Sequence, residues 1–195
     1  MEFDFEREHK PLGKRIWFRI LLWILQLGAA VGLAWILIHV SVERTVMTGS
    51  SMEPTLADGT SIVINKIAYW IGDPDRYDVI VFRQSGSEHS YYNIKRVIGL
   101  PGETVRIADG IVYINGEALQ EPMNVEAVRI GGLAEEDLTL DENEYFVLGD
   151  NRNNSEDSRF ANIGCIVRDD IIGKAWLTLS PFNFVDKLNP ADVDE

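Results

Sequence analysis

Cysteine is nearly absent from this sequence, and basic residues are outnumbered by acidic ones. The chain has 195 residues and one cysteine, Cys165, so an internal disulfide and a cysteine-rich metal cage are excluded. Aspartate and glutamate number 31 against 18 lysines and arginines, which gives a formal net charge of −13. Because phosphate binding needs a basic face, this balance argues against a nucleic-acid partner. We expect Cys165 to be a core residue without a catalytic role.

Histidine is also scarce, and the three histidines are His9, His39 and His89. The first two lie at or before the end of a long apolar segment, so a Ser-His-Asp site beyond that segment could use only His89. A triad is recognised by the spatial roles of its members, and nothing else in the sequence supports one. We expect a site that needs no metal and no cofactor.

The long apolar segment, residues 20–40, carries no full charge if His39 is neutral. As a helix it would extend about 31 Å, which is enough to cross the hydrocarbon core of a bilayer. A cleaved secretory signal is the alternative, but its apolar region would be about 7–15 residues long, with a small-residue cleavage site after it. Because Ser-Val-Glu-Arg follows at residues 41–44, we expect a retained anchor.

Basic residues flank the apolar segment unequally, with five in residues 1–19 and only Arg44 in residues 41–60. The positive-inside rule then places the N-terminus in the cytoplasm and the rest of the chain outside the membrane. We therefore expect a single-pass protein of the plasma membrane. Its expected parts are a cytoplasmic tail (1–19), a transmembrane helix (20–40), an extracytoplasmic domain (45–183) and a polar tail (184–195).

Beyond the anchor, apolar residues occur in short runs separated by Gly, Pro, Asp and Asn. No long stretch with a 3.6-residue period follows, so we predict a mostly β, antiparallel domain. Asp109-Gly110 lies between two β-branched runs and is a strong hairpin signal. The acidic segment 120–143 is expected to be a loop-like insertion or an extended ribbon. The predicted strands are residues 61–69, 79–83, 91–100, 104–108, 111–114, 145–148 and 166–179.

Two adjacent hydroxyls follow a glycine in the segment GSSMEPTL, residues 49–56. A small neighbour gives access to a nucleophile, and a proline stiffens the backbone that holds it. A serine-rich turn without chemistry is the alternative interpretation.

In a second segment, IKRVIGLPGE (residues 94–103), Lys95 interrupts an apolar run. A lysine in a dry setting has a lowered pKa and can accept a proton near neutral pH, although an edge-strand lysine that blocks aggregation is the alternative.

A dense polar loop, GDNRNNSEDSR, occupies residues 149–159. It does not fit an EF-hand calcium loop, because the third position from Asp150 is Arg152 and the sixth is Ser155, where acidic or amide ligands and a glycine are needed. A structural loop with paired charges suits it better. Either aspartate, Asp150 or Asp157, could pair with either arginine, Arg159 or Arg152.

Together with the anchor, these three segments resemble the bacterial type I signal peptidases, in the single-anchor form typical of Gram-positive bacteria. That family consists of Ser/Lys-dyad serine proteases that remove signal peptides from exported preproteins after small residues in an A-x-A pattern. The resemblance implies a β-rich catalytic domain that rests on the bilayer and acts on preproteins. It also implies that Ser51 is the nucleophile and that Lys95 is the general base of an acyl-enzyme mechanism.

The resemblance further implies supporting roles for residues around the dyad. Ser155 matches a hydroxyl that orients the lysine, and Asp157 and Arg159 match a salt bridge that shapes the site beside Asp150. Some members carry a serine two residues before the nucleophile to stabilise the oxyanion, where this chain has Gly49. The oxyanion hole would then rest mainly on the N–H of Ser51, with its second donor left open. Positions near the substrate's apolar pockets are matched by Met52, Leu56 and Ile94.

Two rival functions are weighed against this interpretation. A self-cleaving Ser/Lys repressor of the DNA-damage response would need a DNA-binding domain, where this chain has an apolar segment and an acidic remainder. A membrane-tethered β module that binds partners without catalysis would explain the anchor and the strands. It would leave the serine, the lysine and the polar loop as three coincidences, so we predict an enzyme.

Overall fold

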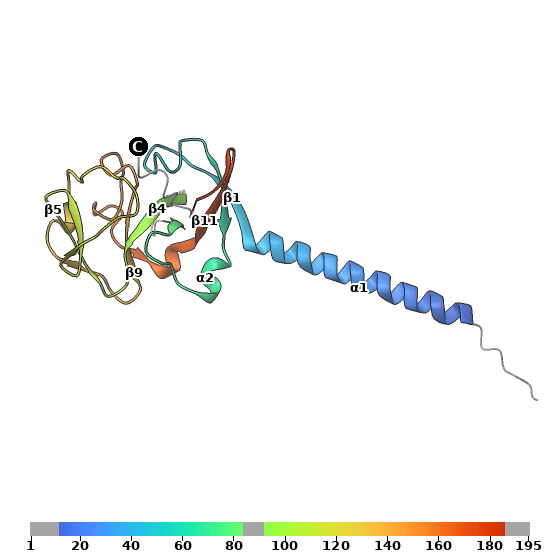
Figure 1. The fold of residues 1–195 in the computed structure, drawn as a ribbon. Coiled ribbons are helices and arrows are strands. Elements are labelled where there is room, and N and C mark those ends of the chain that lie inside the picture. Colours follow the sequence, from blue (N-terminus) through green and yellow to red (C-terminus); the bar gives the residue numbers. More distant parts are fainter. Residues whose placement is uncertain (1–11, 84–91, 186–195) are drawn as a thin grey trace, which may run out of the picture. The chain divides into compact units, whose positions relative to one another are not determined.

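The computed structural model describes residues 12–83 and 92–185, and the chain divides into two units, Met1–Val40 and Ser41–Glu195. The first unit contains one long helix, and the second contains all the strands of the described chain (Figure 1). His89 and parts of the two predicted tails lie outside the described residues.

Helix α1 (Leu12–Ser41) is apolar around most of its circumference. Its portion Ile16–Ser41 has a mean hydropathy of 2.2 and is long and apolar enough to cross a membrane, and none of its most apolar stretch of 18 residues is buried. The side chains of Trp17 and Trp23 are 74% and 73% exposed. Apolar surface costs about 25 cal/mol per Å² in water, so the helix is compatible with a bilayer as its solvent. The predicted anchor, residues 20–40, lies inside this helix.

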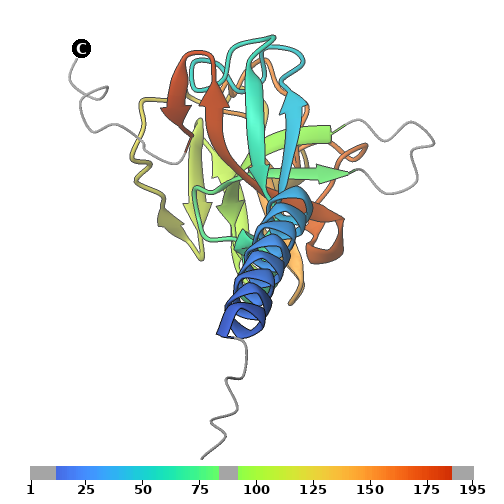
Figure 2. The same cartoon turned by 90° about the vertical axis from the view of Figure 1, so that its right-hand side faces the viewer.

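The second unit is built around an eight-stranded sheet in which every recorded strand pair is antiparallel. The strand order is β1-β2-β11-β3-β4-β9-β10, and β12 pairs with β11. Figure 2 shows β1, β2 and β11 next to one another. The strands are β1 (Val42–Val46), β2 (Ser61–Asn65), β3 (Val79–Arg83), β4 (Tyr92–Gly99), β9 (Glu144–Leu148), β10 (Ile166–Val167), β11 (Ile171–Leu179) and β12 (Phe182–Phe184).

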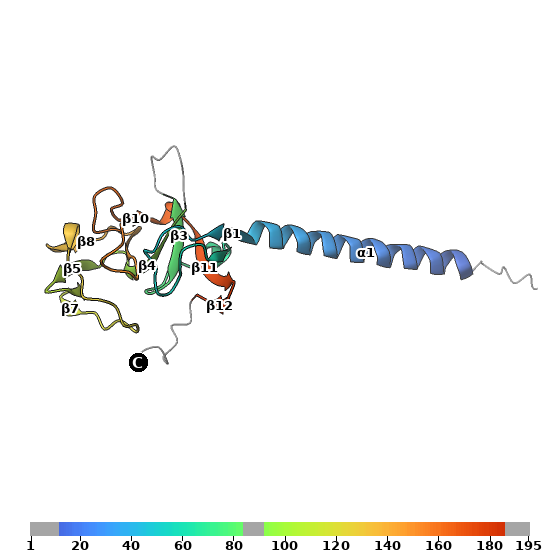
Figure 3. The same cartoon turned by 90° about the horizontal axis from the view of Figure 1, so that it is seen from above.

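A smaller four-stranded sheet follows the order β7-β6-β5-β8 and lies on the far side of β4 from β11 and β12 (Figure 3). Its strands are β5 (Thr104–Ala108), β6 (Ile111–Ile114), β7 (Glu117–Ala118) and β8 (Leu138–Thr139). The Asp109-Gly110 turn between β5 and β6 has φ angles of 52° and 80°. Positive φ at both positions is what a tight two-residue hairpin requires, so the predicted hairpin is confirmed.

Strand β4 lies inside the larger sheet and is buried from Ile94 to Gly99. Three apolar clusters meet along it, and each contains one of its residues: Ile94, Val97 or Ile98. Met52 and Leu56, from the segment between β1 and β2, pack in the same cluster as Ile94. Burying a side chain of this size stabilises the fold by about 1.5–3 kcal/mol, so these contacts hold the serine-bearing segment against β4.

The mostly antiparallel β class is confirmed, while some element boundaries differ from the prediction. The predicted strand 61–69 ends at Asn65, because the Asn65 side chain accepts a hydrogen bond from Ala68 N at 3.2 Å and helix α2 (Ala68–Ile71) follows. The predicted strand 166–179 is interrupted by a 3-10 turn, η2 (Arg168–Asp170). The short strands β1, β7, β8 and β12 were not expected, and the segment 120–143 contains β8 and a 3-10 turn, η1 (Gly132–Ala134).

Candidate active site

The fold brings the Ser51 hydroxyl against the Lys95 amine. Ser51 lies in the connection between β1 and β2, and Lys95 lies in β4. Lys95 Nζ is 2.7 Å from Ser51 Oγ, although the residues are 44 positions apart. This is hydrogen-bond distance, and it is the arrangement in which an amine can take the proton of a serine nucleophile.

The setting of Lys95 lowers the pKa of its amine. Its side chain is buried, and the residue is only 6% exposed. Burial lowers the pKa of the Lys95 amine below its ordinary value of 10.5, while the negative charges of Asp157, Glu156 and Asp150 offset part of this effect. Desolvation, which penalises the charged form, therefore has a larger effect on the pKa than the three carboxylates. The outcome is an amine with a greater share of neutral base at a given pH than an exposed lysine has.

The segment that carries Ser51 is held by the polar loop after β9. Asn151 N donates to Ser51 O at 3.1 Å, and the Asn151 side chain donates to Ser50 O at 3.1 Å. The Asn154 side chain donates to Ser50 Oγ at 2.8 Å. Two of these bonds hold the backbone carbonyls of Ser50 and Ser51, and the third holds the Ser50 hydroxyl, so the position of the nucleophile depends on this loop.

Gly149 lies beside the dyad, and the sequence analysis did not single it out. The register of β4 and β9 pairs Arg96 with Leu148, and continuing it by one residue places Gly149 opposite Lys95. A Cβ at Gly149 would lie 2.2 Å from Ser155 Oγ and 2.5 Å from Ser51 O. Both distances are below any real Cβ contact. Because glycine has no side chain, Ser51 and Ser155 can pack closely against Gly149.

Ser155 is near the dyad without a direct hydrogen bond to it. Its Oγ is buried, and among the described residues it has no hydrogen-bond partner. Ser155 Oγ and Ser51 O both lie close to Gly149, so the Ser155 hydroxyl is beside the residue that carries the nucleophile. Its expected role in orienting Lys95 stays a prediction.

Asp150, Arg152, Asp157 and Arg159 of the polar loop form ion pairs, and their partners settle the alternatives left open by the sequence. Arg159 donates to both Asp157 oxygens, at 2.7 and 2.8 Å. Asp157 also accepts from Gly149 N at 3.1 Å. Arg152 pairs instead with Glu121. Since Arg159 Nη2 also donates to Arg152 O at 2.6 Å, the Asp157–Arg159 pair stiffens the loop from within.

Asp150 pairs with Arg96, which the sequence analysis missed. Arg96 is fully buried, and its guanidinium contacts both Asp150 oxygens at 2.7 and 2.6 Å. Thr55 Oγ1 donates to the same carboxylate at 2.5 Å. Because Arg96 follows Lys95 directly, the two side chains leave β4 on opposite faces. One strand thus supplies the lysine to the site and an arginine that anchors the polar loop.

The three residues expected near substrate pockets, Met52, Leu56 and Ile94, lie together in one buried cluster. Their exposed fractions are 0%, 1% and 3%, so they could form only the floor of a substrate site, and that role stays a prediction. Gly49 has a φ of 85°, and its N–H donates to Asp58 Oδ1 at 2.8 Å. Within the described part of the chain, the N–H of Ser51 has no acceptor.

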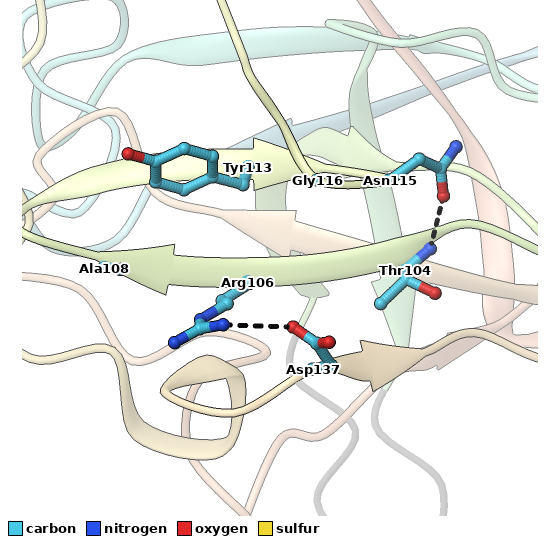
Figure 4. A pocket seen from close by; sticks show the side chains of 7 residues that line it. All are labelled: Thr104, Arg106, Ala108, Tyr113, Asn115, Gly116 and Asp137. Carbon is cyan, nitrogen blue, oxygen red and sulfur yellow. Dashed lines mark hydrogen bonds and ion pairs between the residues drawn. The ribbon is translucent and has the colours of Figure 1, made fainter.

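A hollow of about 610 Å³ lies away from the dyad, on the smaller sheet (Figure 4). Arg106 and Asp137 form an exposed ion pair in it at 3.7 Å. None of the predicted site residues lines this hollow, so we do not assign the reaction to it. Its lining residues are Thr104, Arg106, Ala108, Tyr113, Asn115, Gly116 and Asp137.

Other reactive groups do not form a rival centre. Cys165 is half-buried beside an apolar cluster, and burial raises the pKa of its thiol to about 11. In residues 12–83 and 92–185, no three His, Cys, Asp or Glu side chains are grouped so as to hold a metal ion. A serine hydroxyl against a buried amine is the one arrangement described above that provides both a nucleophile and its base, which is the chemistry of a serine hydrolase.

Comparison with known proteins identifies the family. A family model described as signal peptidase, peptidase S26, matches residues 20–180. The sequence is 38% identical to signal peptidase I T of Bacillus subtilis (strain 168), over 84% of this chain and 86% of that protein. It is 37% identical to signal peptidase I of Leptolyngbya laminosa, over 86% of this chain and 83% of that protein. A solved structure of a signal peptidase I from Enterococcus faecalis V583 is 33% identical and covers 52% of this chain and 96% of that one, with a TM-score of 0.40.

The chain therefore belongs to the signal peptidase family, peptidase S26, a family of serine endopeptidases. The family resemblance found in the sequence is confirmed. Its assignment to the single-anchor form of Gram-positive bacteria stays a prediction.

Proposed function

We propose that this chain is a membrane-anchored signal peptidase that removes N-terminal signal peptides from exported preproteins. In this proposal Ser51 is the nucleophile and Lys95 is the general base. The observation that carries it is the 2.7 Å approach of a buried lysine amine to a serine hydroxyl. Membership of the signal peptidase family supports the substrate class.

The reaction follows from these two groups. The neutral Lys95 amine takes the hydroxyl proton as Ser51 Oγ bonds to the scissile carbonyl carbon. When the tetrahedral intermediate collapses, the peptide bond breaks, and the Lys95 ammonium returns the proton to the departing amine. Lys95 then deprotonates a water molecule that attacks the Ser51 ester, and the serine regains its proton as the signal peptide leaves.

The oxyanion hole and the substrate pockets involve the backbone at Ser51 and the apolar residues below it. The N–H of Ser51 is a suitable donor to the oxyanion, because it is not engaged by another described residue. Gly49 cannot supply a side-chain donor, and its own N–H is bonded to Asp58. Cleavage after an A-x-A pattern needs shallow apolar pockets, and a floor made by Met52, Leu56 and Ile94 suits small substrate side chains.

The anchor belongs to the same proposal. Helix α1 supplies an apolar span of 26 residues, Ile16–Ser41, and the five basic residues in 1–19 favour a cytoplasmic N-terminus. We infer a single pass through the plasma membrane, with residues 45–183 outside. Anchoring confines the enzyme and a preprotein to one membrane, which raises their effective concentration.

The experiment that tests the proposal is cleavage of a model preprotein with an A-x-A site by the full chain in detergent. Wild type should cut after that site, and Ser51→Ala should be folded and inactive. A membrane-tethered β module that only binds partners is the rival, and it predicts no cleavage by either protein. Cleavage by Ser51→Ala at the wild-type rate would refute the assignment of the nucleophile.

A further inference from the structure

The polar loop that holds Ser51 is also hydrogen-bonded to the acidic segment between β7 and β8. The polar loop described above, residues 149–159, is from here on called the dyad loop. Residues 119–133, most of which belong to the acidic segment 120–143, are called the strap. Leu133 N donates to Arg159 O at 2.8 Å, and Arg129 N donates to the Asn153 side chain at 3.0 Å. The strap is attached to the smaller sheet, since Leu119 N donates to Val112 O at 2.8 Å. The strap therefore connects the smaller sheet to the loop that positions the nucleophile.

One contact between strap and loop is a buried ion pair. Arg152 Nη1 donates to Glu121 Oε1 at 2.5 Å, and a second bond joins Nη2 to Oε2. The side chains are only 1% and 9% exposed. Within the described residues, this is the one ion pair that joins the strap to the dyad loop. Removing one partner of a buried pair leaves the other charge uncompensated, so the pair holds both segments in one arrangement.

The Glu121–Arg152 ion pair is connected to the dyad through Gly149 and Asn151. Arg152 Nε donates to Gly149 O at 3.2 Å, and Gly149 is the residue opposite Lys95 that contacts Ser51 O and Ser155. Asn151, between Gly149 and Arg152, donates to Ser51 O. A shift of the Arg152 guanidinium would therefore move the support of Ser51, and with it the contact between Ser51 Oγ and Lys95 Nζ.

We propose that Glu121 is a positioning residue for the Ser51–Lys95 dyad and acts through Arg152 on Gly149. This rests on the proposed function and extends it, because it assigns a role in the reaction to the segment between β7 and β8. Glu121 touches no reacting atom, so its effect is on the placement of the dyad. A misplacement of about 1 Å in such a site costs about 100-fold in rate.

The test is the steady-state cleavage of the model preprotein by the full chain in detergent, across pH. Glu121→Gln should lower kcat about 10- to 100-fold with KM unchanged. The acidic limb of its pH profile should move to higher pH, because a looser loop admits water to Lys95 and weakens the burial that lowers its pKa. A loss of folded protein would lower the rate without moving this limb, so the limb separates positioning from general stability.

Two further variants make the test specific. Adding Glu121→Gln to Arg152→Ala should cause no further loss of kcat, since the glutamate acts through the arginine. Glu103→Gln is the matched control, because Glu103 forms a half-buried ion pair with Arg76 and, within residues 12–83 and 92–185, its side chain has no hydrogen bond or ion pair with the dyad loop. The control should keep wild-type kcat. If Glu121→Gln does not fold, Glu121→Asp, which keeps the charge on a shorter side chain, decides by the same readouts.

The outcomes separate the two claims. If wild type cleaves, Ser51→Ala does not, and a folded Glu121 variant keeps kcat within about threefold with an unmoved acidic limb, the positioning role is refuted and the proposed function stands. A double variant that is clearly slower than Arg152→Ala alone would also refute the route through Arg152. If wild type fails to cleave, both claims fall.

Discussion

Adding a single methyl group at Gly149 should slow the reaction without unfolding the domain. In Gly149→Ala the new Cβ would lie 2.5 Å from Ser51 O and 2.2 Å from Ser155 Oγ, where real Cβ atoms keep at least 3.0 Å. The Ser51 carbonyl must therefore retreat by at least about 0.5 Å, and the serine hydroxyl leaves its position against Lys95. Since about 1 Å of misplacement costs about 100-fold, we expect kcat to fall about 10- to 100-fold.

The stability cost of the same change is smaller than the stability of the domain. Overpacking of this kind costs about 1–3 kcal/mol, against a typical total of about 5–15 kcal/mol. The assay is the initial rate of preprotein cleavage at saturating substrate, with folding checked by near-UV circular dichroism. Gly72→Ala is the matched control, because its Cβ would meet only Ala68 O, at 3.9 Å. A folded Gly149→Ala protein that cleaves within about threefold of wild type would refute the steric argument.

Three further predictions concern the charges of the site. Lys95→Arg should abolish cleavage, because a guanidinium does not deprotonate near neutral pH; near-normal cleavage would exclude Lys95 as the base. Asp150→Asn should lower the free energy of unfolding in urea by about 3–5 kcal/mol, since it leaves the buried Arg96 without its carboxylate, whereas Asp137→Asn at an exposed pair should leave it unchanged. A lysine with a lowered folded pKa binds its proton less tightly when folded, so wild-type stability should rise with pH up to the ordinary value of 10.5. The advantage of Lys95→Met over wild type should therefore be greatest at neutral pH and shrink toward pH 10.5; a gap independent of pH would contradict the lowered pKa.

Much of the fold was predictable because local signals were strong. The strands Val79–Arg83, Thr104–Ala108 and Ile111–Ile114 match the prediction residue for residue, since short β-branched runs between turn residues indicate strands. Strands such as β7 (Glu117–Ala118) have too few residues to show an alternating pattern. Their pairing is a property of the tertiary fold.

The site was predictable where one residue carries the chemistry and less so where residues support it from a distance. Ser51 and Lys95 were predicted because their two segments and the polar loop together resemble one family, whereas each segment alone would also suit a structural turn or an edge strand. Arg96 and Glu121 do not, because their partners lie 54 and 31 positions away. In the sequence, Gly149 is a glycine at the start of a polar loop, where glycine is common, so the sequence does not indicate its proximity to the dyad. Only the approach of Ser51 and Ser155 in space shows why no side chain fits there.

Cleavage of a model preprotein by wild type, Ser51→Ala and Lys95→Ala between about pH 6 and about pH 10 tests the Ser51–Lys95 mechanism. We expect that wild type cuts after the A-x-A site, that both variants are folded and inactive, and that activity falls on the acidic side as Lys95 becomes protonated. If the variants cleave as wild type does, the Ser51–Lys95 dyad is not the catalytic site.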